Sequence, residues 1–117
     1  PEEWTDEPLA TLPTATFADL AQVRHHREVT VLDVRRVNEW RDGHLVGVLH
    51  IPLHDLLKRM DELPDGEIWV HCASGYRSSI ASSLIAATGR RVVSINDTYA
   101  TSAAKVGLPV ETALAAS

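Results

Sequence analysis

The only cysteine of the chain, Cys72, lies where a reactive nucleophile would be expected. It follows the apolar run 68–71 and precedes the segment 73–77, which ends in Arg77, and we expect a helix from about Ser78. In open parallel sheets, active sites form where a strand ends and the chain turns into a helix. Loop amides, the helix dipole and the Arg77 guanidinium would favour the thiolate over the thiol. Because the thiolate is the nucleophilic form, we predict a reactive sulfur at Cys72.

Each residue of this loop also has a structural interpretation. A lone cysteine is more often a buried small hydrophobe, but its place between an apolar strand and a Gly-Tyr-Arg-Ser loop favours the reactive one. For Arg77 the alternative is a surface salt bridge, which its spacing from Cys72 makes the weaker interpretation. For Tyr76 and Ser74 the alternative is ordinary loop polarity. Gly75 suits a tight loop, because glycine reaches positive φ without penalty.

The elements that would position this loop alternate between strand and helix. A capping box at 16–19 predicts a first helix that runs to about His26. Nearly continuously apolar runs predict buried parallel strands at 29–34, 68–71 and 91–95, with a short extended segment at 48–52. Helical segments are expected at 38–41, 53–63 and 78–88, the last with an apolar stripe of Ile80, Ala81, Leu84 and Ile85. We therefore predict an α/β fold, a small mainly parallel sheet flanked by helices.

Length and composition describe one ordinary globular domain. Residues 1–14 are rich in proline and acids and are expected to be an extended lead-in or linker, which favours a fragment of a longer protein; residues 15–117 form the domain. The net charge of −5 argues against nucleic acid as a partner. No apolar stretch is long enough for a membrane span and no signal peptide is recognisable, so we expect a cytoplasmic protein. The six histidines show no metal-binding spacing, so neither a metal nor an organic cofactor is expected.

The segment 71–78, His-Cys-Ala-Ser-Gly-Tyr-Arg-Ser, resembles the active-site loop of rhodanese homology domains. The segments Leu-Asp-Val-Arg at 32–35, Glu-Trp at 39–40, Gly-His at 43–44, Ile-Pro-Leu at 51–53 and Gly-Leu-Pro-Val at 107–110 are similar to the family's other motifs, in the same order. The resemblance implies a thiosulfate sulfurtransferase-like activity. Cys72 would take a sulfane sulfur from a small donor such as thiosulfate and pass it to a thiol or cyanide. Arg77 would hold the anionic donor, while the amides of Ala73, Ser74, Gly75, Tyr76, Arg77 and Ser78 would surround the transferred sulfur.

Two other functions remain open beside this one. Phosphatases and arsenate reductases of the same fold have five residues between Cys and Arg, whereas this chain has four, which suits one sulfur atom better than a tetrahedral oxyanion. A non-catalytic rhodanese module for sulfur relay or partner binding is the alternative of a different class. The sequence is also similar to rhodanese domains fused behind metallo-β-lactamase-fold hydrolases, so a fused or associated metallo-hydrolase is a possible partner.

Several further positions lie near the loop in the sequence or in the family's fold. Asp33 is interpreted as loop support through hydrogen bonds, and Arg35 either pairs with Glu39 or faces the pocket. His71 is interpreted as a core histidine rather than a general base. The chain departs from many family members at Thr98-Tyr99, where a Gly-Gly pair is usual, and at Ala103, where a Trp is usual. The family places this region beside the active site, so the departure bears on pocket shape and on the choice of acceptor.

Overall fold

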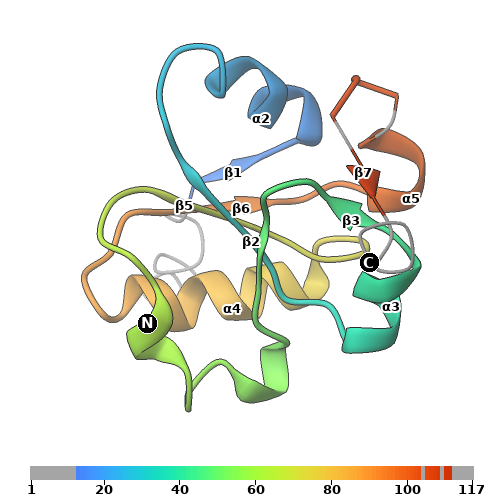
Figure 1. Ribbon diagram of the computed structural model, residues 1–117. Helices are drawn as coiled ribbons and strands as arrows, with labels where there is room; N and C mark the ends of the chain where they lie inside the picture. Colours follow the sequence, from blue (N-terminus) through green and yellow to red (C-terminus); the bar gives the residue numbers. More distant parts are fainter. Residues whose placement is uncertain (1–12, 104, 109, 112–117) are drawn as a thin grey trace, which may run out of the picture.

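A five-stranded parallel sheet forms the centre of the molecule (Figure 1). We analysed a computed structural model that describes residues 13–103, 105–108 and 110–111. The strand order is β1-β6-β5-β2-β4, and the bounds are Thr14–Ala15 for β1, Val92–Ile95 for β6, Ile68–His71 for β5, Thr30–Asp33 for β2 and Leu49–His50 for β4. A separate antiparallel pair joins β3 (His44–Leu45) to β7 (Val110–Glu111). The predicted α/β architecture is therefore confirmed.

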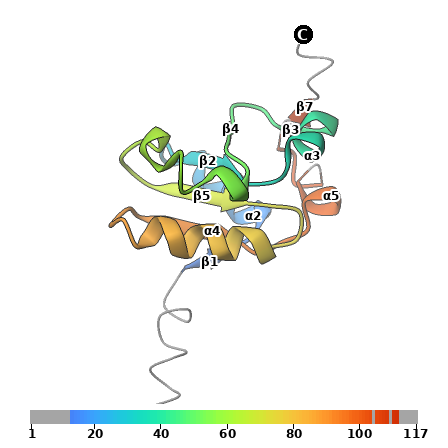
Figure 2. The ribbon, with the colours of Figure 1, turned by 90° about the horizontal axis from the view of Figure 1, so that it is seen from below.

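Helices cover both faces of the sheet. Figure 2 shows α4 (Tyr76–Ala86) lying across one face, whereas Figure 1 shows α2 (Phe17–Val23) on the other. The short helices α3 (Val37–Asp42) and α5 (Tyr99–Ser102) lie near one edge of the sheet, and two 3-10 turns, η1 (Leu53–Asp55) and η2 (Met60–Glu62), precede β5. The central strands are largely apolar because both of their faces are covered, and the polar Asp33 and His71 are their last residues.

Alternation along the strands divides the apolar core into two clusters. Leu32 and Val70 pack with residues of α4 on one face, and Cys72 belongs to the same cluster. Val31 and Trp69 point to the other face and pack with α2, whose Phe17 is fully buried. The period of two along each strand produces this division. The strand register pairs Asp33 of β2 with His71 of β5, so both strands end at the same edge of the sheet.

The first helix begins as predicted. The Thr16 hydroxyl accepts a hydrogen bond from the Asp19 amide, and the Asp19 carboxylate accepts one from the Thr16 amide, which is the reciprocal capping box. The segment 53–63 differs from the expected helix, because its two 3-10 turns are separated at Arg59, whose φ of −116° and ψ of 18° interrupt the helix.

The helix after Cys72 begins two residues earlier than expected and presents a different face to the sheet. Its buried residues are Ser78, Ala81, Ser82 and Ile85, while Ile80 is 38% exposed, so the predicted apolar stripe is wrong in part. The reason lies at the start of α4, where the Ser78 amide must face inward to reach Cys72. Each residue turns an α-helix by about 100°. With Ser78 facing inward, positions 81, 82 and 85 therefore also face inward, and position 80 faces outward.

The first strand overlaps the end of the expected lead-in. Strand β1 begins at Thr14, the last residue of the expected lead-in, and pairs with β6 through Thr14 and Ser94. Residues 1–12 lie outside the described part of the chain. No helix among the described residues has the length and hydropathy that crossing a bilayer would require.

Candidate active site at the carboxyl edge of the sheet

Cys72 is the first residue after the central strand β5, and its thiol is held by main-chain N–H groups. The amides of Gly75 and Ser78 donate to Sγ over 3.1 and 3.2 Å. Cys72 is only 1% exposed. A buried sulfur that accepts two N–H bonds is suited to carry negative charge, because each donor stabilises the charged form directly.

Opposing effects set the acidity of this thiol. Burial raises the Cys72 pKa, whereas hydrogen bonds from the amide and hydroxyl of Ser78 and from the amides of Gly75 and Ser74 lower it, and the net result is a lowered pKa. The hydrogen bonds outweigh burial because they act on the thiolate itself. The thiolate is therefore favoured relative to that of a free cysteine.

Two residues fix the shape of the loop. The Ser78 hydroxyl lies within hydrogen-bond distance of the carbonyl oxygens of Gly75 (3.0 Å) and Ile95 (3.1 Å), which ties the start of α4 to the end of β6. Gly75 has a φ of +109°, and a Cβ at this position would lie 2.5 Å from Oδ1 and 3.2 Å from Cα of Asn96. Only glycine satisfies both conditions, since other residues disfavour positive φ and the contact involves backbone.

The remaining loop residues take different positions. Ala73 is half-buried, and its carbonyl oxygen accepts a hydrogen bond of 2.9 Å from the Tyr99 amide. Ser74 is exposed. Tyr76, the first residue of α4, is 77% exposed, so its side chain lies in solvent. Among the described residues, the donors whose bonds to Sγ meet hydrogen-bond geometry are the amides of Gly75 and Ser78.

The Arg77 guanidinium is occupied by a carboxylate. Its two terminal nitrogens donate to the two oxygens of Glu39 over 2.6 and 2.9 Å, and both side chains are about one quarter exposed. The salt bridge that the sequence made the weaker interpretation is therefore present. Hydrogen bonding to Arg77 lowers the pKa of Glu39 to about 2. The Arg77 pKa is raised, first by Glu39 and to a lesser degree by the nearby Cys72, so the guanidinium stays charged beside the sulfur.

Arg35 does not pair with Glu39. Its guanidinium donates to both oxygens of the Asp33 carboxylate over 2.9 to 3.1 Å and to the Gly43 carbonyl oxygen over 2.7 Å. Asp33 and Arg35 are 0% and 5% exposed. Burial raises the Asp33 pKa, but the bonds from Arg35 and the charges around it lower it overall. This ion pair fixes the turn that follows β2, directly beside the end of β5.

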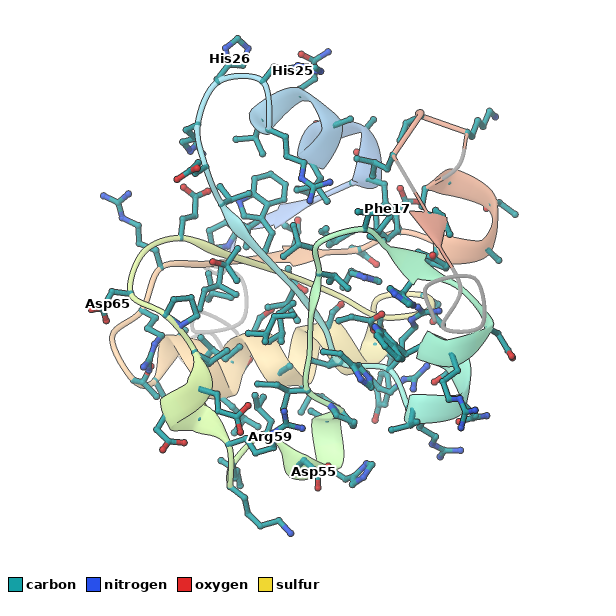
Figure 3. The ribbon with its side chains drawn as sticks, in the orientation of Figure 1. Phe17, His25, His26, Asp55, Arg59 and Asp65 are labelled. Carbon is teal, nitrogen blue, oxygen red and sulfur yellow. The ribbon has the colours of Figure 1, made fainter. Side chains whose placement is uncertain are left out.

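His71 and Tyr99 stack on each other next to the Cys72 loop. His71 is fully buried, its Nε2 is 3.7 Å from an Asp33 oxygen, and burial lowers its pKa, so it is a neutral core residue, as interpreted from the sequence. The Tyr99 ring lies parallel to His71 at 5.4 Å and has the Arg35 guanidinium 4.2 Å from its centre. Phe17 meets both rings edge-on, and Figure 3 shows it between α2 and this region. The departure at Tyr99 thus fills space behind the loop.

Four of the other histidines lie at the surface or stack on Trp40. His25 and His26 are exposed at the turn after α2, where Figure 3 shows them at the surface. His44 and His50 stack on the ring of Trp40, with centroids 4.0 and 5.1 Å away. In the described part of the chain, no group of three or more histidine, cysteine or acidic residues has a metal-binding arrangement.

Sequence reasoning missed two residues of this region, Glu39 as the partner of Arg77 and Asn96 as the residue facing Gly75. The spacing of four between Arg35 and Glu39 suggests a helical pair. Arg35, however, precedes α3, which begins at Val37, so the two residues do not share a helix. The signal for Glu39 was its place in the Glu-Trp motif. No local signal identified Asn96. It follows the last residue of β6, and only the folding of the chain brings it against Gly75.

The fold and the loop define an α/β domain with a main-chain-stabilised thiol at the carboxyl edge of its sheet. The family model for the rhodanese-like domain matches residues 16–100. The chain therefore belongs to the rhodanese-like domain family. A rhodanese-related protein from Thermoplasma volcanium superimposes with a TM-score of 0.74 and 29% identity, over 85% of this chain and 97% of that one.

Curated relatives share this domain within longer chains. The chain is 32% identical over 96 residues to the Bacillus subtilis protein named "Putative sulfur carrier protein YrkF", covering 80% of this chain and 52% of that protein. It is 39% identical over 62 residues to an HTH-type transcriptional regulator of Mycobacterium tuberculosis, covering 52% of this chain and 27% of the regulator. The chain thus spans about half of the first relative and about a quarter of the second.

Proposed function

We propose that this domain is a sulfurtransferase that carries sulfane sulfur as a persulfide on Cys72. The observation that carries the proposal is the pair of amide donors, Gly75 and Ser78, on a buried thiol whose pKa is lowered. Family membership and the name of the Bacillus relative support sulfur transfer in general. Thiosulfate as donor, and cyanide or a thiol as acceptor, belong to the proposal.

The reaction consists of two displacements at sulfur. The Cys72 thiolate attacks the outer sulfur of thiosulfate, so a bond from Sγ to that sulfur forms as the sulfur–sulfur bond of thiosulfate breaks, and sulfite leaves with the electron pair. Cyanide or an acceptor thiolate then attacks the outer persulfide sulfur. Thiocyanate or a new persulfide forms, and the electron pair of the broken bond returns to Cys72 as thiolate. Neither step needs an external oxidant or reductant.

Main-chain groups supply the stabilisation in this scheme. The amides of Gly75 and Ser78 already meet Sγ. The first N–H groups of a helix have no intrahelical acceptor, so those of Tyr76 and Arg77 at the start of α4 are available for the outer sulfur. Preorganised donors of this kind stabilise charge without rearranging during the reaction. The charged persulfide would thus be held much as the thiolate is.

The direct test is to expose the protein to thiosulfate and weigh it by mass spectrometry. We expect the mass to increase by one sulfur atom and the Cys72→Ser variant to remain unchanged. Cyanide should remove the added sulfur and release thiocyanate. Labelling of the Cys72→Ser variant, or no labelling of the wild type by any sulfane-sulfur donor, would contradict the proposal.

A sulfur relay without turnover is a second candidate, favoured by the carrier name of the Bacillus relative and by the place of the matching region in longer chains. Steady-state assay separates the two. A sulfurtransferase converts many equivalents of thiosulfate and cyanide, whereas a relay module accepts one sulfur and releases it only to a protein partner.

A further inference from the structure

A small groove borders the Cys72 loop. It has a volume of about 200 Å³ and is lined by Val34, Arg36, Leu53, His54 and Arg77. Val34 and Cys72 belong to one core cluster, against which Leu53 packs, and Arg77 closes the loop. The groove therefore lies beside the sulfur-bearing loop, between the turn after β2, the η1 turn and the start of α4.

The charge of this groove is positive and only partly compensated. Arg77 is neutralised by its two bonds to Glu39. Arg36 is exposed, and no carboxylate of the described part of the chain pairs with its guanidinium. His54 makes one long contact to a carboxylate, with Nε2 3.6 Å from an Asp55 oxygen. None of the described residues that line the groove is acidic.

Size and charge together select one class of ligand. A volume of about 200 Å³ corresponds to about six or seven water molecules at ~30 Å³ each, which suits an anion of a few heavy atoms. An unpaired guanidinium is the side chain best matched to the planar edges of oxyanions. Because Arg77 both lines the groove and belongs to the loop that follows Cys72, we expect this ligand to be a reactant or product of the sulfur chemistry.

We propose that Arg36 and His54 form the subsite for the anionic group that leaves when a donor such as thiosulfate transfers its sulfane sulfur to Cys72. This inference rests on the proposed function, and it assigns the recognition of donor charge to Arg36 rather than to Arg77. Arg77 instead acts as a positioning residue whose charge Glu39 balances. Sulfite after transfer and thiosulfate before it present the same charged oxygens to Arg36.

The test uses two alkylating reagents that differ in charge. Iodoacetate and iodoacetamide both transfer a substituted methylene to the Cys72 thiolate, with iodide as the leaving group, but only iodoacetate carries a carboxylate. The ratio of their rate constants therefore reports anion recognition and needs no sulfur transfer. Arg36→Gln should lower this ratio about tenfold or more, the effect of losing one hydrogen bond to a charged group, and should change the iodoacetamide rate much less.

A matched control separates local from general charge effects. Arg91 is an exposed arginine just before β6, at the opposite end of the strands from the Cys72 loop, and Arg91→Gln removes the same charge. At physiological ionic strength, where screening acts over about 8 Å, this control should leave the ratio unchanged. His54→Gln should lower it by a smaller factor. Thermal melts should coincide for all variants, because the altered side chains are exposed.

Sulfur transfer is then measured on the same proteins. Arg36→Gln should raise the KM for thiosulfate about tenfold with little change in kcat. An unchanged reagent ratio in Arg36→Gln, or an equal fall in Arg91→Gln, would overturn the subsite even if the wild type transfers sulfur. A ratio that depends on Arg36 in a protein that never accepts sulfur would support the subsite and contradict the proposed function instead.

Discussion

The ion pair between Glu39 and Arg77 should stabilise the fold as well as the loop. The pair joins α3 to the start of α4 through two short hydrogen bonds, with about a quarter of each side chain exposed. Replacing either residue by glutamine removes one charge and leaves the partner's charge without its counterion. A double-mutant cycle of Glu39→Gln and Arg77→Gln isolates the energy of the interaction itself.

The magnitude follows from the acidity of the carboxyl group. The Glu39 pKa falls from an ordinary 4.5 to about 2, which corresponds to at most about 3.5 kcal/mol at about 1.4 kcal/mol for each tenfold change in proton affinity. The Arg36 amide also contributes to this fall, and solvent screens a partly exposed pair, so we expect a coupling energy of about 1 to 2 kcal/mol. That value exceeds the coupling of most surface salt bridges.

The stabilisation from the Glu39–Arg77 pair should decrease at low pH. Because the folded-state pKa is depressed, the stabilisation is fully present above about pH 4.5 and is lost as the pH falls towards 2. Urea unfolding between pH 2 and 7 should therefore show a steeper loss of stability in the wild type than in Glu39→Gln. A coupling energy below about 0.3 kcal/mol, or parallel pH profiles for the two proteins, would refute this reasoning.

Three further predictions concern the loop and its surroundings. Gly75→Ala should destabilise the protein by about 2 kcal/mol or more, because positive φ and the contact with Asn96 are both unfavourable, and urea denaturation measures this; a stability equal to the wild type would contradict the loop geometry. The rate of Cys72 alkylation by iodoacetamide should rise with pH around a midpoint below that of a free cysteine, since the loop lowers its pKa; a midpoint at or above the free value would exclude activation. Tyr99→Leu should cost about 1 to 2 kcal/mol through lost contacts with Arg35 and His71, whereas unchanged stability would show that the ring packs loosely.

The strands and the place of Cys72 could be predicted from the sequence because their signals are local. The run 68–71 is largely apolar because both faces of the strand are covered, and the residue after the strand lies at the edge of the sheet. The capping box at Thr16 is equally local, since its two hydrogen bonds join residues three apart. Such features depend on a few consecutive residues and not on contacts with distant parts of the chain.

Features that depend on the meeting of distant segments could not be predicted. The rotation of α4 follows from the need of Ser78 to reach both Cys72 and the end of β6, so the buried face contains serines rather than the isoleucine at position 80. The pairing of Glu39 with Arg77 likewise joins residues 38 positions apart. In each case one long-range contact determines an orientation that the local apolar pattern does not contain.

In this loop the donors to the sulfur are main-chain amides, whereas the charged Arg77 guanidinium binds Glu39 instead of Sγ. The amides of Gly75 and Ser78, three and six residues after Cys72, both lie within 3.2 Å of Sγ, so the main chain closes around a single atom. Arg77 lies between them in sequence, but its side chain extends to Glu39. Transfer of a phosphoryl group requires charge directed at several equatorial oxygens, whereas a sulfane sulfur carries its charge on one atom. Neutral donors around the sulfur, with the guanidinium paired to Glu39, match the single charged atom of the proposed persulfide better than they match a phosphoryl group.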